Sequence, residues 1–265
     1  MSVLKDMALT EGKHVSIKGN GIVVQMLNPD PLAANILAFT KQTRLTLDGG
    51  LFEEVKAWPK EKLEEELEYI SNSIRSSWEF IDVTFSIQNF SRAAQQQLTR
   101  TRTANYAMQS LRILDMSDFD MQVPPSIRNN PRALAIFEEV HEFIGEKYRE
   151  LVSPEVGAQA QDARGVLPLN TCSGGLMKIN LRNLIGLITA RTSARTQGEY
   201  TEIVDGFISE LRKHFWWIEP FLEDKKMAAS KKIYKLTQEL QNDAKIDEAT
   251  KQFIWKQIDH LKGVQ

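Results

Sequence analysis

The chain has a single cysteine, Cys172, among its 265 residues. One cysteine cannot form an internal disulfide, so the sequence predicts a protein of a reducing compartment, and we expect the cytoplasm. Cys172 remains a formal nucleophile candidate. No histidine lies near it in the sequence, however, and a small buried apolar side chain is the simpler interpretation.

Long apolar runs are also missing from the sequence. No segment approaches the roughly 20 apolar residues that a membrane-spanning helix needs, and the first residues, MSVLKDMALTEGKH, lack the apolar stretch of a signal peptide. We therefore expect no membrane partner. The formal net charge is -2 and the pI is near 6.2. A protein that binds nucleic acid through its charge is usually strongly basic, so nucleic acid is not the expected partner.

Several common motifs are absent as well. The four histidines are scattered over the chain without metal-ligand spacing, so the sequence predicts no metal site. There is neither a glycine-rich phosphate loop ending in Lys-Ser/Thr nor a G-x-G-x-x-G motif after a strand. A dinucleotide would therefore be bound without a Rossmann turn.

What the chain does have is a positive stretch without carboxylates. From Val83 to Leu114 it contains no Asp or Glu, but it contains Arg92, Arg100, Arg102 and Arg112. We call residues 83–114 the first arginine segment. Guanidinium groups without neighbouring carboxylates suit a ligand that carries phosphate. A structural arginine cluster on a solvated face is the alternative.

A second stretch of this kind, residues 163–198, lies between Asp162 and Glu199, and we call it the second arginine segment. Its cations are Arg164, Lys178, Arg182, Arg191 and Arg195. On a helix, Asn180 and Arg191 would project from one face about 16 Å apart along the axis. Two such segments in a nearly neutral chain predict a polyanionic small ligand.

Hydrophobic periodicity predicts an α+β domain at residues 1–223 and a helical C-terminal extension at residues 224–265. Two strands are expected around the Gly19-Asn20-Gly21 turn in residues 14–26, with further extended segments at 80–87 and 169–179. The expected helices span residues 31–44, 59–75, 131–152, 154–164, 180–191, 197–215, 225–241 and 247–261, with another starting at Ser91 as its N-cap. We expect the 131–152 helix to be core.

The residues of both segments resemble one enzyme family. Arg100-Thr101-Arg102, followed by Asn105, Ser110 and Arg112, is similar to the signature of the flavin-dependent thymidylate synthases. The second segment agrees independently, with matching stretches at residues 163–168, residues 180–184 and Arg191 through Gln197 and Glu199. The resemblance extends over roughly residues 14–222.

The resemblance implies the fold of that family, a small, mainly antiparallel sheet with helices. It also implies a homotetramer that binds flavin adenine dinucleotide (FAD) between subunits. The implied reaction methylates C5 of a pyrimidine nucleoside monophosphate, deoxyuridylate (dUMP) to thymidylate (dTMP). Methylenetetrahydrofolate would donate the one-carbon unit and NADPH would reduce the flavin.

Site residues follow from the resemblance by position. The nucleotide would be bound by Gln97, Arg100, Gln109, Ser110, Arg112, Arg164 and Arg191. The flavin would be bound by Arg100, Thr101, Arg102, Asn105, Asn180 and Arg182. Arg191 and Ser110 are the expected catalytic residues, with Arg191 stabilising negative charge that grows on the pyrimidine.

The chain also departs from the family pattern. Thr101 and Phe80 stand where the family has histidines, and Ala107 and Met108 replace a polar pair. These departures leave two alternatives open. One is a C5 hydroxymethylase or hydroxylase acting on dCMP, dUMP or UMP, and the other is a non-catalytic flavin- or nucleotide-binding relative.

The lysines of the C-terminal extension allow a third alternative, binding of RNA or of a protein partner. These lysines are Lys225, Lys226, Lys231, Lys232 and Lys235. An ordinary solvated helix face is the preferred interpretation of this pattern.

Overall fold

The computed structural model describes residues 13–45, 51–191, 198–222 and 250 of the chain. Internal contacts divide the chain into two units, Met1–Phe221 and Leu222–Gln265. The helices predicted at 225–241 and 247–261 lie outside the described residues apart from Thr250, so the predicted domain boundary at residue 223 stays a prediction. No helix in the described part combines the length and the apolar character needed to cross a bilayer.

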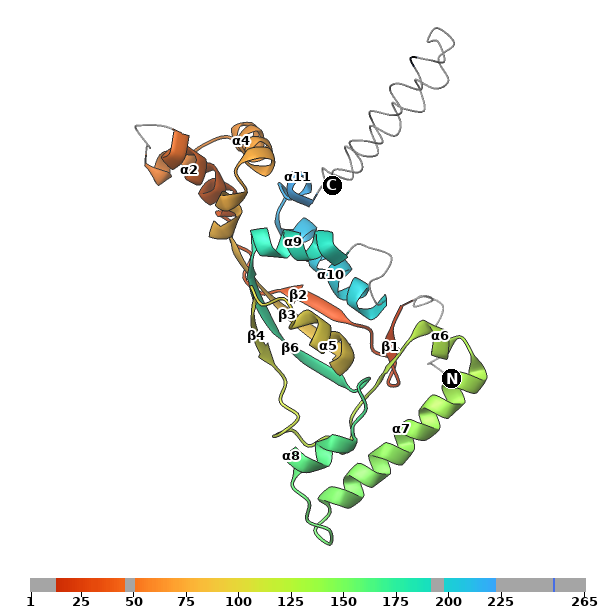
Figure 1. Ribbon diagram of the computed structural model, residues 1–265. Helices are drawn as coiled ribbons and strands as arrows, with labels where there is room; N and C mark the ends of the chain where they lie inside the picture. The colour runs from red at the N-terminus through yellow and green to blue at the C-terminus, as the bar shows by residue number, and fades with distance from the viewer. Residues whose placement is uncertain (1–12, 46–50, 192–197, 223–249, 251–265) are drawn as a thin grey trace. The chain divides into compact units, whose positions relative to one another are not determined.

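The centre of the first unit is a four-stranded sheet in the order β2-β3-β6-β4 (Figure 1). Its strands are β2 (Val23–Met26), β3 (Asp82–Ser91), β4 (Asn105–Met108) and β6 (Cys172–Asn180). Every neighbouring pair is antiparallel. The predicted α+β class with a mainly antiparallel sheet is therefore confirmed, although β4 was not predicted.

One face of this sheet is covered by helices. Val83, Phe85 and Ile87 alternate along β3 and are fully buried, as the sequence pattern predicts. The covering helices are α5 (Arg92–Leu98), α9 (Leu181–Arg191) and α10 (Gly198–His214). The ring of Phe207 on α10 lies 4.6 Å from the ring of Phe85. The core of the first unit therefore lies between the sheet and these helices.

The opposite face of the sheet is more exposed. Residues paired across antiparallel strands point to the same face, and two rows of paired residues end on β4 at Ala107 and Asn105. The rows are Gln25–Ser86–Leu176–Ala107 and Thr84–Lys178–Asn105. All of these side chains are exposed or half-buried in the first unit. Part of the first arginine segment therefore borders an accessible sheet face.

A group of helices precedes β3 in the chain. They are α2 (Ala33–Leu45), α3 (Phe52–Lys56), α4 (Lys60–Ser73) and the 3-10 helix η2 (Arg75–Phe80). The helices predicted at 31–44 and 59–75 are thus confirmed as α2 and α4. Phe80 was expected to begin a strand, but it ends η2 and is 62% exposed.

The predicted hairpin at residues 14–26 is wrong in its pairing. The turn itself exists, because the Ser16 amide donates to the Asn20 carbonyl at 2.9 Å and Gly19 has a φ of 84°. The strand before the turn, β1 (Val15–Ser16), pairs with β5 (Gln122–Val123), whereas β2 pairs with β3. The longer β3 offers β2 a continuous row of backbone partners that β1 does not.

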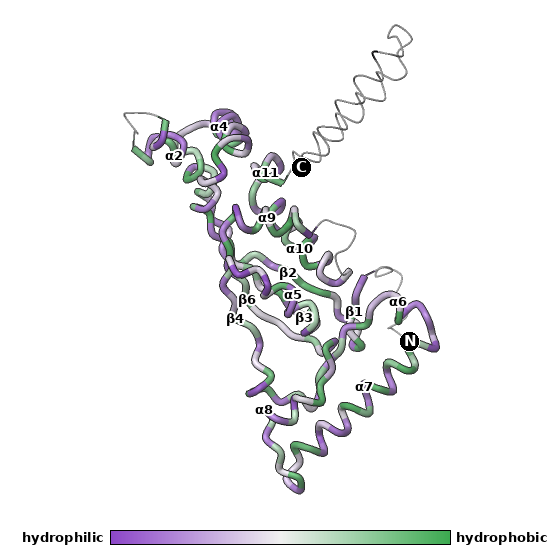
Figure 2. Tube along the Cα trace, in the orientation of Figure 1, coloured by the Kyte–Doolittle hydropathy of each residue, from purple (hydrophilic) through white to green (hydrophobic). Residues whose placement is uncertain are grey.

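Two predictions for the middle of the chain also need correction. Helix α7 (Pro131–Val152), which follows the short helix α6 (Pro125–Arg128), has the predicted bounds, but only its Gly145 and Tyr148 are buried. Figure 2 shows apolar and polar residues alternating along this helix. Its apolar stripe of Ile136, Val140 and Phe143 is about half-exposed in the chain, since amphipathic spacing does not tell what covers a helix. The helix predicted at 154–164 is reduced to α8 (Ala160–Ala163) and the 3-10 turn η3 (Arg164–Val166).

The last described element of the chain is α11 (Glu219–Leu222).

Candidate functional site

The first arginine segment begins where β3 passes directly into α5. Ser91 is the last residue of β3 and the N-cap of α5, and its Oγ accepts a hydrogen bond from the Ala94 amide at 3.0 Å. The predicted cap is therefore confirmed. A bulge between Ile87 and Phe90, with Asn89 in the left-handed region at φ 58°, bends the strand just before this junction. The junction fixes the start of α5, whose far end leads to the signature arginines.

After α5 the chain turns through Arg100, Thr101 and Arg102 before it enters β4. The hydroxyl of Tyr106 on β4 donates a hydrogen bond shared by the carbonyls of Leu98 and Thr101, at 2.8 and 3.0 Å. Burial raises the pKa of Tyr106 to about 12, so the phenol stays protonated and keeps donating at neutral pH. This bond ties the turn to the sheet.

The guanidinium groups of this turn are available to a ligand. Arg100 and Arg102 are exposed, and neither forms a salt bridge within the described part of the chain. Arg112, also exposed, donates from Nη2 to Gln161 Oε1 at 3.3 Å. Three predicted anion-binding arginines therefore keep their full positive charge.

Two further arginines of the segments lie near each other. Arg92 opens α5, and its backbone amide donates to the Thr171 carbonyl at 3.0 Å, which holds it beside the chain that follows Arg164. The pKa of Arg92 is lowered by burial and then by the charge of Arg164. Two like charges held in proximity favour an anion that binds to both.

Strand β4 attaches the first segment to the second. Asn105 pairs with Lys178 and Met108 pairs with Gly175 of β6. A Cβ on Gly175 would lie 2.9 Å from the Ala107 carbonyl oxygen, so glycine allows this close approach of the two backbones. Just beyond β4, Gln109 is held against β6, since its Oε1 accepts from the Gly174 amide at 3.0 Å.

The cations of the second segment are partly compensated. Arg182 Nη1 lies 2.5 Å from Glu79 Oε1, and Lys178 Nζ lies 2.8 Å from Asp82 Oδ2. Both pairs are about half-exposed. Asn180 ends β6 and its Oδ1 accepts from the Asn183 amide at 2.9 Å, which caps α9. The segment lacks carboxylates in the sequence, but β3 and η2 supply them in space.

The end of α9 approaches the signature turn through α10. The Arg191 guanidinium lies 5.2 Å from the centre of the Tyr200 ring, and the Tyr200 side chain also lies beside Thr101. The predicted residues thus do not form a single group in one chain. Thr101 and Arg191 approach each other through Tyr200, while Arg112 lies near Gln161 and Arg164 lies near Arg92. Sequence reasoning did not identify Tyr200 or single out Arg92 as a site residue.

A cavity of about 350 Å³ lies among α2, α3 and the end of η2 and was not predicted. It is lined by Ile36, Phe39, Thr40, Thr43, Arg44, Phe52 and Phe80. Arg44 donates to Ser76 Oγ at 2.9 Å and to Ser77 Oγ at 3.2 Å, and its charge stands at an otherwise apolar, aromatic wall. Phe80 follows Glu79, the partner of Arg182. The signal in the sequence was the acid-free stretch 31–47 around Arg44.

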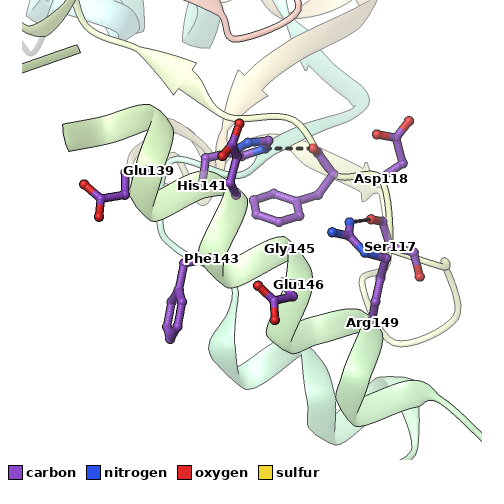
Figure 3. A pocket seen from close by; sticks show the side chains of 10 residues that line it. Ser117, Asp118, Glu139, His141, Phe143, Gly145, Glu146 and Arg149 are labelled. Atoms are coloured by element: carbon purple, nitrogen blue, oxygen red, sulfur yellow. Dashed lines mark hydrogen bonds between the residues drawn. The ribbon is translucent and has the colours of Figure 1, made fainter. Parts of the chain in front are cut away.

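Two other cavities, like the first, contain none of the predicted site residues. One, of about 470 Å³, lies between α7 and the loop before β5 (Figure 3). There His141 Nε2 is 3.1 Å from the Phe119 carbonyl, Arg149 donates to the Ser117 carbonyl at 2.9 Å, and Phe143 points away from the loop. The other, of about 590 Å³, lies between the β1–β2 turn and α10.

Cys172 does not have the surroundings of a nucleophile. Burial and the nearby carboxylates of Asp120 and Glu199 raise the pKa of its thiol well above its ordinary value. The thiolate is therefore disfavoured at neutral pH, which argues against a nucleophile. Cys172 was expected to be a small buried apolar side chain, but it is half-buried.

Comparison with known proteins identifies similar sequences and a similar structure. The family model described as thymidylate synthase complementing protein matches residues 23–215. The chain is 35% identical over 141 residues to the flavin-dependent thymidylate synthase of Nitratidesulfovibrio vulgaris, covering 51% of this chain and 58% of that protein. It is 27% identical over 212 residues to the enzyme of that name from Clostridium tetani, covering 74% and 84%.

The extent of these matches varies. The chain spans a little over half the length of the Nitratidesulfovibrio vulgaris and Geobacter sulfurreducens relatives, at 58% and 54%. Among solved structures, thymidylate synthase X from Helicobacter pylori, crystallised with FAD and dUMP, matches with a TM-score of 0.53 and 22% identity. That match covers 76% of this chain and 99% of the other. At this level of identity the likeness shows a shared fold.

Proposed function

The chain belongs to the thymidylate synthase complementing protein family, and from this premise we propose that it is a flavin-dependent enzyme that methylates C5 of a pyrimidine deoxynucleotide, dUMP to dTMP. The observation that carries the proposal is the antiparallel pairing of β4 with β6. This pairing holds parts of the two arginine segments, which are far apart in the sequence, next to each other. Relatives named flavin-dependent thymidylate synthase support the same reaction.

The donors of these segments fit FAD. Arg100 and Arg102 have no carboxylate partner among the described residues, so a diphosphate would meet uncompensated guanidinium groups. Asn105, Asn180 and the half-buried Thr101 add uncharged hydrogen-bonding groups. Arg182 is already paired, but that pair is exposed and therefore weak enough to exchange for a phosphate. Bound FAD, once reduced, would supply the electrons that convert a transferred one-carbon unit to a methyl group.

The nucleotide would be bound by the remaining predicted residues. Arg112 and Arg164 would bind its phosphate with Arg100, and Gln97, Gln109 and Ser110 would add hydrogen bonds. Arg191 would stabilise negative charge on the pyrimidine as C5 becomes nucleophilic, since a fixed cation strengthens such an interaction away from bulk water. Ser110 would orient the base. Its oxygen accepts from the Arg112 amide at 3.4 Å, so its hydroxyl proton remains available for a hydrogen bond to the base.

We further infer that the protein is a homo-oligomer, with a tetramer expected. The predicted ligand-binding arginines are mostly exposed in one chain, whereas a buried site gives cations their strongest effect. The half-exposed stripe of Ile136, Val140 and Phe143 on α7 offers a surface that a second copy would cover. Sedimentation of the protein and of its Phe143→Glu variant tests this. A monomeric wild type, or a variant with an unchanged mass, contradicts it.

The co-substrates and the compartment belong to the same proposal. NADPH would reduce the flavin, methylenetetrahydrofolate would donate the one-carbon unit, and the enzyme would act in the cytoplasm. A diverged reaction is the second candidate, a C5 hydroxymethylation or hydroxylation of dCMP, dUMP or UMP. It is favoured by Phe80, which lines an apolar cavity where the family has a histidine, and by Met108, which is packed against Gly175.

A visible absorption spectrum tests both candidates. We expect the purified protein, supplied with FAD, to retain flavin bands after gel filtration, and we expect those bands to shift when dUMP is added. Turnover of dUMP with methylenetetrahydrofolate and NADPH should then release dTMP. A shift with dCMP or UMP but not with dUMP would favour the diverged reaction. A protein that retains no flavin and binds no pyrimidine nucleotide would overturn the proposal.

A further inference from the structure

Tyr200 is a buried tyrosine in the first turn of α10. Its side chain is fully buried, with 0% exposed. The Arg191 guanidinium lies over its ring, 5.2 Å from the ring centre. A cation at this distance is attracted by the negative face of an aromatic ring. Because the ring is packed on all sides, it can hold the guanidinium in one direction.

The hydroxyl of Tyr200 has unusual surroundings. The side chains of Thr101 and Arg191 contact it as weak hydrogen-bond partners, but in the described part of the chain neither contact has ordinary hydrogen-bond geometry. Buried polar groups of this kind are rare because they cost free energy. Burial also raises the pKa of Tyr200, so the phenol is neutral and does not compensate the charge of Arg191.

The preceding residue fixes Tyr200 in place. The buried carboxylate of Glu199 accepts hydrogen bonds from the Ser91 amide at 2.5 Å and from Ser91 Oγ at 2.6 Å. Ser91 caps the start of α5, whereas Thr101 lies in the turn after its end. Two consecutive residues of α10 therefore contact both ends of α5, and α10 cannot shift without moving the signature turn.

We propose that Tyr200 is a positioning residue for Arg191. Its ring holds the Arg191 guanidinium beside Thr101, so that cations of the two arginine segments act on one ligand. We expect the hydroxyl to contribute less than the ring, since its contacts with Thr101 and Arg191 lack ordinary hydrogen-bond geometry. The inference rests on the proposed function only in taking a pyrimidine nucleotide as the ligand of Arg191.

A double-mutant cycle on dUMP affinity tests this role in the full chain loaded with FAD. We expect Tyr200→Leu to weaken dUMP binding about tenfold and Tyr200→Phe to change it less than about threefold, as estimated from cation–π strength. In an Arg191→Ala background, Tyr200→Leu should add less than about twofold, because the side chain through which Tyr200 acts is gone. Equal losses in both backgrounds, or no loss in either, would overturn the proposal.

Two controls keep the test decisive. If Tyr200→Leu does not fold, fluorinated phenylalanines at position 200 offer a second test. They keep the volume of the ring but weaken the negative electrostatic potential of its face. The dUMP affinity should then fall stepwise with fluorination, and a flat series contradicts the proposal.

If the wild type binds no pyrimidine nucleotide, the proposed function fails. The same cycle on the urea midpoint then still decides the role of Tyr200, since it needs no ligand. Additive effects there would show that Tyr200 does not hold Arg191.

Discussion

The two arginine segments differ in what surrounds their cations. In residues 83–114, Arg100 and Arg102 have no carboxylate partner in the described part of the chain, whereas in residues 163–198 Lys178 and Arg182 each have one. Both stretches lack Asp and Glu in the sequence. The difference arises because β6 pairs with β3, whose first residue, Asp82, lies opposite Asn180. A stretch without carboxylates in sequence is therefore not always without them in space.

Because of this difference, we expect the two segments to contribute to the proposed site in different ways. In the proposed site, the first segment would present uncompensated charge to the ligand, while the charge of the second would be partly neutralised until the ligand displaced Glu79 or Asp82. Exposed pairs of this kind contribute only about 0.2–1 kcal/mol, so displacing them costs little.

The largest effect is expected from the uncompensated arginines. Arg102→Ala should weaken FAD binding about 10- to 100-fold, since a hydrogen bond to a charged group contributes about 1.5–3 kcal/mol. Arg182→Ala should weaken it less, because the charge of Arg182 is already partly compensated by Glu79. Fluorescence titration of FAD measures both. Arg132→Ala, on the exposed side of α7, is the matched control. An equal loss in the control, or a larger loss for Arg182→Ala, would contradict the comparison.

The next effect concerns the attachment of the first segment to α10. Glu199→Gln should lower the free energy of unfolding by about 1–3 kcal/mol, because one of the two bonds from Ser91 loses its acceptor inside the protein. Urea denaturation measures the change. Glu138→Gln, at an exposed position of α7, should have almost no effect. A loss of stability as small as that of the control would mean that Glu199 does not anchor α5.

A smaller effect is expected when Arg182 of the second segment loses its carboxylate partner, Glu79. Glu79→Gln should leave Arg182 uncompensated and raise FAD affinity by up to about fivefold, the equivalent of an exposed ion pair. The salt dependence of binding should become steeper, because one more cation is then available to the phosphates. Glu61→Gln, in the first turn of α4, serves as the control. An affinity that does not rise would mean that Glu79 does not compete with the flavin.

The smallest effect is the pH dependence of the turn that carries Arg100 and Arg102. The pKa of Tyr106 is raised by burial from its ordinary value of 10 to about 12. Its contribution to stability is therefore complete below pH 10 and is lost as pH rises to about 12, by less than about 1 kcal/mol because the group is only half-buried. Tyr106→Phe should show a shallower fall in urea midpoint over this range. An unchanged slope would contradict the assignment.

Local features of the fold could be predicted from the sequence because their causes are local. The cap at Ser91 depends on the residues that follow it, and the buried face of β3 depends on alternation along one strand. The helices that became α2, α4, α9 and α10 follow from apolar spacing. Membership of the family followed from short motifs in a fixed order, which the match over residues 23–215 confirmed.

Local residue patterns were thus enough to predict the class of fold, most helices, the family and the arginines on which the proposed function depends. Tertiary structure alone decided that β1 pairs with β5, that the apolar stripe of α7 is uncovered in one chain, and that Arg182 has a carboxylate partner. The contact of the Arg191 guanidinium with the ring of Tyr200 also became visible only in the tertiary structure. The physical reason is the same in each case. Periodicity reports the faces of one element, whereas pairing, compensation of charge and burial depend on which distant element folds against it.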